Sequence, residues 1–190
     1  FTSDCGGRLT VINAETLAVI KIFEFGTYIP ASPAIKDGQV FFFAHDGMLH
    51  GIGIKDMAIL KIQDKSDDSA KGKEKEPLMQ SPAVSSEYIV SCGSKGTIKV
   101  FSSPEKRFIS EKKLSGKLNS PLILGENVLV TGENGVITLL ELPSLKEKWA
   151  LRTPYEYQDG AVFYGSGFLV SDLDGNVFCY SFKAIGENSK

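Results

Sequence analysis

The sequence predicts an all-β fold that repeats one structural unit about every 40 residues, and three observations support this prediction. A turn glycine recurs at intervals of 40, 49, 39 and 40 residues, as Gly7, Gly47, Gly96, Gly135 and Gly175. The dipeptide Ser-Pro recurs at Ser32, Ser81 and Ser120, at intervals of 49 and 39 residues. The longer interval of 49 residues falls at the same place for both markers, where the charged segment 64–76 adds about ten residues to an otherwise uniform period.

Each unit contains the same order of short apolar runs. Ser-Pro precedes a first run, and a second run follows it, as at residues 40–43, 88–90 and 128–130. A turn that ends in glycine leads to a third run, at residues 9–12, 48–54, 97–101, 136–142 and 176–182. Because the runs are short, rich in β-branched and aromatic residues and bounded by turn residues, they indicate β-strands. Asn-Gly and Asp-Gly supply the positive φ that a tight hairpin needs.

A fourth run completes the unit in four places, at residues 18–25, 58–62, 107–113 and 147–151. Residues 13–21 could be taken for a helix, but Val19, Ile20 and Ile22 fit a strand better. We therefore expect 18 strands: three in the first unit (about residues 1–25), four in each of the next three (about 28–63, 78–115 and 117–152) and three in the fifth (about 155–183).

Four antiparallel strands in about 40 residues, repeated along the chain, indicate the blades of a β-propeller. The sequence therefore predicts that residues 1–190 form a single, incomplete propeller domain of about five four-stranded antiparallel blades. Residues 64–76 are expected to be a flexible charged insert and residues 184–190 a polar tail. Since the first unit lacks an inner strand and the fifth an outer one, we expect the C-terminal part of a larger propeller, with edges that would promote association.

The repeat resembles the pyrroloquinoline-quinone-type repeat. The resemblance rests on Ser32-Pro33-Ala34-Ile35 before Asp46-Gly47, on Ser81-Pro82-Ala83-Val84 before Gly96-Thr97, and on Ser120-Pro121 before Asn134-Gly135. It implies a ring of seven or eight blades, of which this chain would be a fragment. The docking motif of the quinone enzymes, roughly Ala-x-Asp-x-x-Thr-Gly-x-x-x-Trp, is degraded here: its Thr-Gly is missing, and Trp149 is the single tryptophan. No set of residues matches the cofactor and calcium ligands of that family, so we expect no cofactor.

Two segments, Val170 to Tyr180 and Phe1 to Leu9, resemble the C-terminal propeller of large acyl-activating enzymes of the beta-alanine-activating type, in the acyl-CoA synthetase family. This resemblance implies a non-catalytic propeller module of an adenylate-forming enzyme, acting as a scaffold or binding a protein or small ligand. Two alternatives stay open. One is a scaffold like the bacterial outer-membrane assembly lipoprotein with the same repeats, and the other is a fragment of a quinoprotein dehydrogenase.

Composition narrows the choice of partner and compartment. A formal net charge of -2 removes the electrostatic case for nucleic acid, which requires a clustered basic surface. No apolar run approaches the roughly 18 residues that suggest a membrane span. The three cysteines, Cys5, Cys92 and Cys179, are far apart and odd in number, which disfavours a disulfide framework and favours a reducing compartment. We expect a cytoplasmic protein that contacts protein partners or neighbouring domains of the same chain.

The sequence offers an interaction face but no catalytic or metal site. Because strands run alternately up and down, the turns that end in glycine share one face with the connections between units. The acidic residues of these turns would form that face: Asp4, Asp46, Glu133, Asp172 and Asp174. The simpler interpretation is that Asp and Asn only build the turns. His45 and His50 are too few for a metal site, and the cysteines share no base motif, so whether any parent protein is an enzyme stays open.

Overall fold

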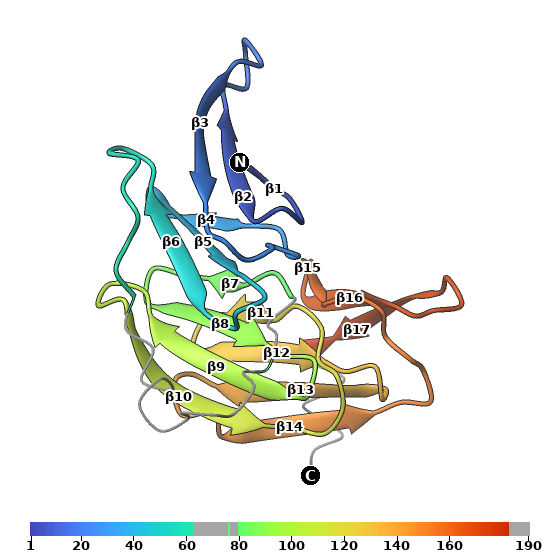
Figure 1. The fold of residues 1–190 in the computed structure, drawn as a ribbon. Helices are drawn as coiled ribbons and strands as arrows, with labels where there is room; N and C mark the ends of the chain where they lie inside the picture. The colour runs from blue at the N-terminus through green and yellow to red at the C-terminus, as the bar shows by residue number, and fades with distance from the viewer. Residues whose placement is uncertain (63–75, 77–79, 183–190) are drawn as a thin grey trace.

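The computed structural model describes residues 1–62, 76 and 80–182, and these residues form 17 strands in five antiparallel sheets. The sheets follow one another around a common centre, from β1–β3 at one end of an arc to β15–β17 at the other (Figure 1). The inner strand β7 contacts both β4 and β11, so neighbouring sheets meet at their inner edges. This radial order confirms the predicted all-β propeller fold.

In every sheet, strands that are consecutive in sequence pair with each other. Sheet 1 contains β1 (Thr2–Ser3), β2 (Arg8–Ile12) and β3 (Val19–Glu24), and sheet 2 contains β4 (Ala34–Lys36), β5 (Gln39–Phe43) and β6 (Leu49–Gly53). Sheet 3 contains β7 (Ala83–Val84), β8 (Tyr88–Cys92), β9 (Thr97–Ser102) and β10 (Arg107–Lys113). Sheet 4 contains β11 (Leu122–Leu124), β12 (Asn127–Thr131), β13 (Val136–Glu141) and β14 (Glu147–Arg152). Sheet 5 contains β15 (Val162–Tyr164), β16 (Gly167–Ser171) and β17 (Val177–Ser181).

The predicted fourth strand of the second unit, residues 58–62, is wrong. The structure reduces it to an isolated bridge between Ile59 and Ile52. Two backbone hydrogen bonds still join the segment to β6, from the Leu60 N–H to the Gly51 carbonyl (2.8 Å) and from the Gly53 N–H to the Ala58 carbonyl (2.9 Å). Glycine weakens a strand interior, and β6 contains two, Gly51 and Gly53. Most of the expected insert (64–75) and the whole expected tail (184–190) lie outside the described residues.

One turn geometry recurs in all five sheets, between the strand pairs β1–β2, β5–β6, β8–β9, β12–β13 and β16–β17. We call it the central turn. The N–H of its glycine donates to the carbonyl three residues earlier, at 3.0–3.4 Å, and a second backbone bond closes the turn at 2.8–3.4 Å. The five glycines have φ between 71° and 92°, a left-handed conformation that glycine adopts without steric cost. The repeating glycine therefore marks a real structural repeat.

A second turn, between the third and outer strands, also recurs but lacks glycine. Leu17, Met57, Lys106 and Leu145 occupy its left-handed position, with φ between 51° and 58°. A non-glycine residue pays roughly 1–2 kcal/mol for this conformation.

Alternate residues of each strand face opposite neighbours, and this alternation builds the core. In β5, Val40 and Phe42 pack toward sheet 1, whereas Phe41 and Phe43 pack toward sheet 3. In β12, Val128 and Val130 pack toward sheet 3, whereas Leu129 packs toward sheet 5. Four apolar clusters therefore lie between the five sheets, one at each junction. We call the side of a sheet that faces the next sheet in sequence its forward face, and the opposite side its backward face.

Candidate interaction face

Asp4 and Asp172, two of the predicted face residues, build the turns that carry them. The Asp172 carboxylate accepts hydrogen bonds from the side-chain amide of Asn176 (2.8 Å) and from the backbone N–H groups of Asn176 (2.8 Å) and Asp174 (3.0 Å). The Asn176 side-chain bond is the main reason why the pKa of Asp172 lies below its ordinary value. Asp4, at the equivalent position of sheet 1, accepts the Arg8 backbone N–H (3.0 Å) and pairs with its guanidinium (2.8 Å). The Arg8 backbone bond is the largest cause of the lowered Asp4 pKa.

Asp46 also accepts a backbone hydrogen bond within its own turn, but it lies directly before the turn glycine. It accepts the Met48 backbone N–H (2.9 Å) and lies 3.1 Å from Nε2 of His50. Asn134, at the equivalent position of sheet 4, accepts the N–H of Val136 (3.3 Å). In four of the five central turns a side-chain oxygen thus accepts the N–H of the residue after glycine. These contacts support the simpler interpretation for Asp4, Asp46 and Asp172.

The central turn of sheet 3 has no acidic or amide side chain of its own, and Glu76 supplies one from the end of the expected insert. Its carboxylate accepts hydrogen bonds from the Lys95 backbone N–H and from Oγ1 of Thr97 (2.6 Å). Glu76 falls at the end of the segment 64–76, for which the sequence predicted a flexible insert and no such contact. No local signal reveals it, because 19 residues separate the carboxylate from Lys95.

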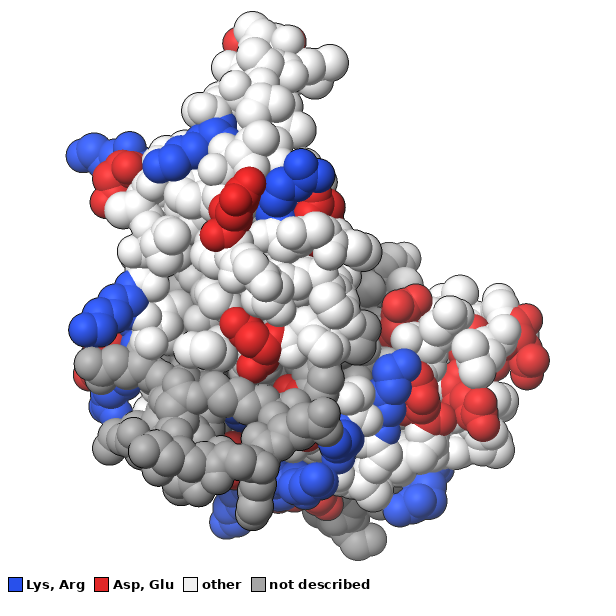
Figure 2. Space-filling model, viewed as in Figure 1, with Lys and Arg blue, Asp and Glu red and all other residues white. Residues whose placement is uncertain are grey.

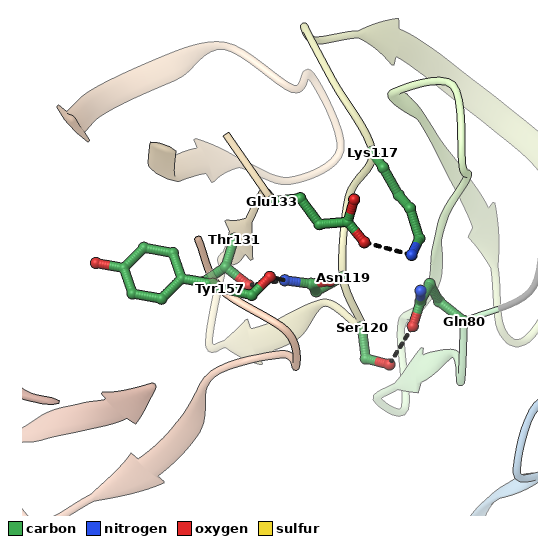
Figure 3. Close-up of polar contacts among 7 residues, drawn as sticks. All are labelled: Gln80, Lys117, Asn119, Ser120, Thr131, Glu133 and Tyr157. Atoms are coloured by element: carbon green, nitrogen blue, oxygen red, sulfur yellow. Dashed lines mark hydrogen bonds and ion pairs between the residues drawn. The ribbon is translucent and has the colours of Figure 1, made fainter. Parts of the chain in front are cut away.

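The connection that leads into sheet 4 lies against the central turn, as expected from the alternating strand directions. Nζ of Lys117, in the connection, forms an ion pair with the Glu133 carboxylate, in the turn (Figure 3). The Glu133 N–H also donates to the Lys117 carbonyl (3.1 Å). Equivalent backbone bonds join His45 to Tyr28 (3.0 Å) and Leu173 to Glu156 (3.1 Å). The structure therefore brings turns and connections together on one face, which we call the turn face.

Next to the Lys117–Glu133 ion pair, a buried polar network connects sheets 4 and 5. The side-chain amide of Asn119 donates to the Tyr157 carbonyl (2.9 Å) and to Oγ1 of Thr131 (3.2 Å) (Figure 3). The Thr131 hydroxyl in turn donates to the Asp159 carbonyl (3.1 Å). Asn119 and Thr131 are fully buried, so these bonds fix the connection into sheet 5 relative to β12. Nothing in the sequence pattern had pointed to this network.

His45, His50 and Cys92 pack among neighbouring side chains. His45 stacks on Tyr28 with ring centroids 4.4 Å apart, and His50 contacts Phe42 and Asp46. Within the described part of the chain, no group of three or more His, Cys, Asp or Glu side chains could hold a metal ion. Burial raises the pKa of the Cys92 thiol, which keeps it protonated and unreactive. No helix among the described residues is long and apolar enough to cross a membrane.

Sheets 3 and 5 differ sharply in charge. Residues 153–182 contain four acidic residues and no Lys or Arg, whereas residues 80–117 contain seven basic and three acidic residues. Figure 2 shows acidic side chains gathered at the right of the view, where β16 and β17 lie in Figure 1. Two of these acidic residues, Asp172 and Asp174, belong to the central turn of sheet 5, whose tip residue Leu173 is 58% exposed.

A crevice of about 220 Å³ lies between sheets 3 and 4. Its polar lining includes Asn134, Glu147 and Arg152, and its apolar lining includes Leu118 and Val130. Its lining contains neither a histidine nor a cysteine.

Comparison with known proteins supports the fold and leaves the family open. No protein-family model matches the sequence, and no curated protein matches it. Among solved structures, BamB from Moraxella catarrhalis superposes with a TM-score of 0.79 at 15% identity, over 94% of this chain and 53% of that one. The computationally designed protein Ika8 superposes with a TM-score of 0.72 at 16% identity, over 93% of this chain and 53% of that one. The chain thus spans about half the length of these neighbours and shares the β-propeller fold of BamB.

Neither comparison supports an origin in an acyl-activating enzyme, which was the leading expectation from the sequence. The more general expectation, a β-propeller fold, agrees with the likeness to BamB.

Proposed function

We propose that this chain is a non-catalytic β-propeller module that binds protein partners through its turn face and acts as a scaffold. One observation carries the proposal: five turns with the same backbone geometry present different side chains at their tips. The two tip residues are Cys5-Gly6, His45-Asp46, Ser94-Lys95, Glu133-Asn134 and Leu173-Asp174. A rigid framework with variable loop residues is the usual design of a recognition surface.

The central turn of sheet 5 is the strongest anchor point on this face. Leu173 is an exposed apolar side chain, and the neighbouring Asp174 is exposed as well. Tyr155 stacks on Phe178 with ring centroids 4.2 Å apart and adds a half-exposed aromatic surface. Aromatic and apolar anchors with a charged rim are typical of protein interfaces. The acidic surroundings favour a partner that presents basic groups around an apolar one.

Photo-crosslinking tests the proposal. A photoreactive amino acid replaces Leu173 on the turn face, and in a matched control it replaces Leu17, which is 76% exposed in the turn between β2 and β3. We expect Leu173 to give discrete protein adducts in cells that Leu17 does not give. The substitution Asp174→Lys on the same protein should weaken those adducts. Equal adduct patterns from both positions, or none from Leu173, would refute a protein-binding turn face.

The larger protein or assembly to which the module belongs is a separate question. Of the settings considered, a scaffold in outer-membrane assembly agrees better with the fold likeness to BamB than an acyl-activating enzyme does. Identification of the crosslinked partner distinguishes these two settings. An envelope assembly protein supports the outer-membrane scaffold, whereas adenylation or carrier domains support the acyl-activating enzyme, for which we propose a cytoplasmic location. Reconstitution with quinone and calcium followed by a dye-reduction assay tests the quinoprotein alternative, for which we expect no activity.

A further inference from the structure

The two ends of the arc expose faces that the repeat buries everywhere else. The second residue after each turn glycine lies on the forward face of its sheet. At this position Leu9, Leu49, Ile98 and Ile137 are 0–4% exposed, because the next sheet covers them. Val177 of sheet 5 occupies the same position and is 67% exposed. The sequence thus keeps an apolar residue at an interface position that nothing in the described structure covers.

The backward face shows the same contrast at the other end of the arc. The fifth residue after the turn glycine packs against the preceding sheet: Ile52, Phe101 and Leu140 there are 0% exposed, and Tyr180 is partly buried. Ile12 of sheet 1 occupies the same position and is 37% exposed. Ile22, opposite Thr10 on the same side of sheet 1, is 49% exposed. Exposed apolar residues that fall on one face in this way mark an interaction surface.

The inner edge of sheet 1 is open as well. Sheets 2 to 5 each have a short inner strand, and sheet 1 begins with β1 instead. A cavity of about 450 Å³ lies beside β1. It is lined by Phe1, Thr2 and Ser3 at the start of the chain, by Ile29 and Pro33 in the connection to sheet 2, and by Ile35 in β4. The turn glycine of sheet 5 is uncovered too, unlike those of sheets 3 and 4. A Cβ at Gly96 or Gly135 would meet the backbone of the connection that follows, whereas a Cβ at Gly175 would meet nothing within 4 Å.

We propose that both faces are blade interfaces, and that each takes a further antiparallel sheet of this same repeat. The four interfaces inside the structure each pack a forward face against a backward face, and the two end faces continue that series. Sheet 5 presents a free forward face with Val177 and Val162, and sheet 1 presents a free backward face with Ile12 and Ile22. The partner that fits sheet 5 therefore has the backward face of a blade, and the partner that fits sheet 1 has a forward face.

This inference goes beyond the proposed function and does not depend on it, because it concerns the flat faces of the end sheets and not the turns. A second copy of the chain carries both required faces, so it serves as the probe. Sheet 5 of one copy should pack on sheet 1 of another, in a head-to-tail arrangement that leaves one free face at each end.

Charged substitutions that block one face at a time test the proposal. In Ile12→Glu the backward face of sheet 1 is blocked, and in Val177→Glu the forward face of sheet 5 is blocked. We expect the unmodified chain to form concentration-dependent oligomers in sedimentation velocity. Each variant alone should associate at least about tenfold more weakly, because a carboxylate would be buried without a partner. An equal mixture of the two variants should form a one-to-one dimer, since each supplies the face that the other lacks.

The matched control is Leu17→Glu, which adds the same charge at an exposed turn residue and should leave association unchanged. An unmodified chain that stays monomeric at all concentrations would overturn the proposal. So would a mixture of Ile12→Glu and Val177→Glu in which no dimer forms, or a Leu17→Glu variant that associates as weakly as the other two. The turn-face crosslinks at Leu173 are a separate readout, so failure here leaves the proposed function intact.

Discussion

Truncation at one repeat position in two different sheets should have very different costs. Ile98 and Val177 are both the second residue after a turn glycine, but Ile98 is fully buried between sheets 3 and 4, whereas Val177 is two-thirds exposed. Ile98→Ala removes three carbon atoms, which at about 0.8 kcal/mol each gives about 2.4 kcal/mol in lost transfer free energy. The cavity left behind raises the expected loss to about 3–4 kcal/mol, within the usual range for such substitutions. Val177→Ala should cost less than about 0.5 kcal/mol.

Urea unfolding followed by circular dichroism measures both changes, at a protein concentration low enough to keep the chain monomeric. Domains of this kind are stabilised by only about 5–15 kcal/mol, so a loss of 3–4 kcal/mol would shift the midpoint strongly. Equal costs for Ile98→Ala and Val177→Ala would refute the assignment of equivalent positions to a covered and an uncovered interface.

Three further predictions concern the turns and the tyrosines. Gly96→Ala should destabilise the fold by at least about 1 kcal/mol more than Gly175→Ala in urea unfolding: both glycines have positive φ, but only Gly96 has backbone in the way of a Cβ. Leu17→Asn should stabilise the fold by roughly 0.5–1 kcal/mol, because asparagine tolerates the left-handed conformation better; a loss of stability would contradict this. Burial raises the pKa of Tyr180 above its ordinary value of 10.0, and its hydroxyl lies 3.1 Å from that of Tyr157. As the pH rises, the tyrosine therefore loses its proton in the unfolded chain first, so the contribution of Tyr180 to stability should be complete below pH 10.0 and should decline above it. Urea unfolding below and above pH 10.0 measures this decline in stability, which should be smaller in Tyr180→Phe.

The fold could be predicted from sequence because its repeat has local causes. The turn glycines need a left-handed conformation, and the apolar runs between them alternate faces with period 2, so spacing alone located most strands. The outer strand of sheet 3, predicted at residues 107–113, is found at Arg107–Lys113. The outer strand of the second unit was mispredicted because residues 58–62 have strand-like composition, while the weakness lies in their partner strand, at Gly51 and Gly53.

The candidate site was harder to predict because its contacts cross between units. Asp4 and Asp172 stand three residues before a turn glycine and Asp46 stands one before it, a spacing that could have shown that they accept hydrogen bonds within their own turns. Nothing local shows that Glu76 completes the turn of sheet 3. Nothing local shows that Asn119 reaches the Tyr157 carbonyl either, 38 residues away.

A double-mutant cycle across one junction tests the radial stacking of the sheets most directly. Leu129 and Val130 are neighbours in β12, but Leu129 belongs to the cluster shared with Phe168 of sheet 5, whereas Val130 belongs to the cluster shared with sheet 3. Leu129→Ala combined with Phe168→Leu should show a coupling free energy of roughly 0.5–3 kcal/mol, and Val130→Ala combined with Phe168→Leu should show almost none. Equal coupling in the two cycles, or coupling only in the second, would contradict the stacked-blade architecture.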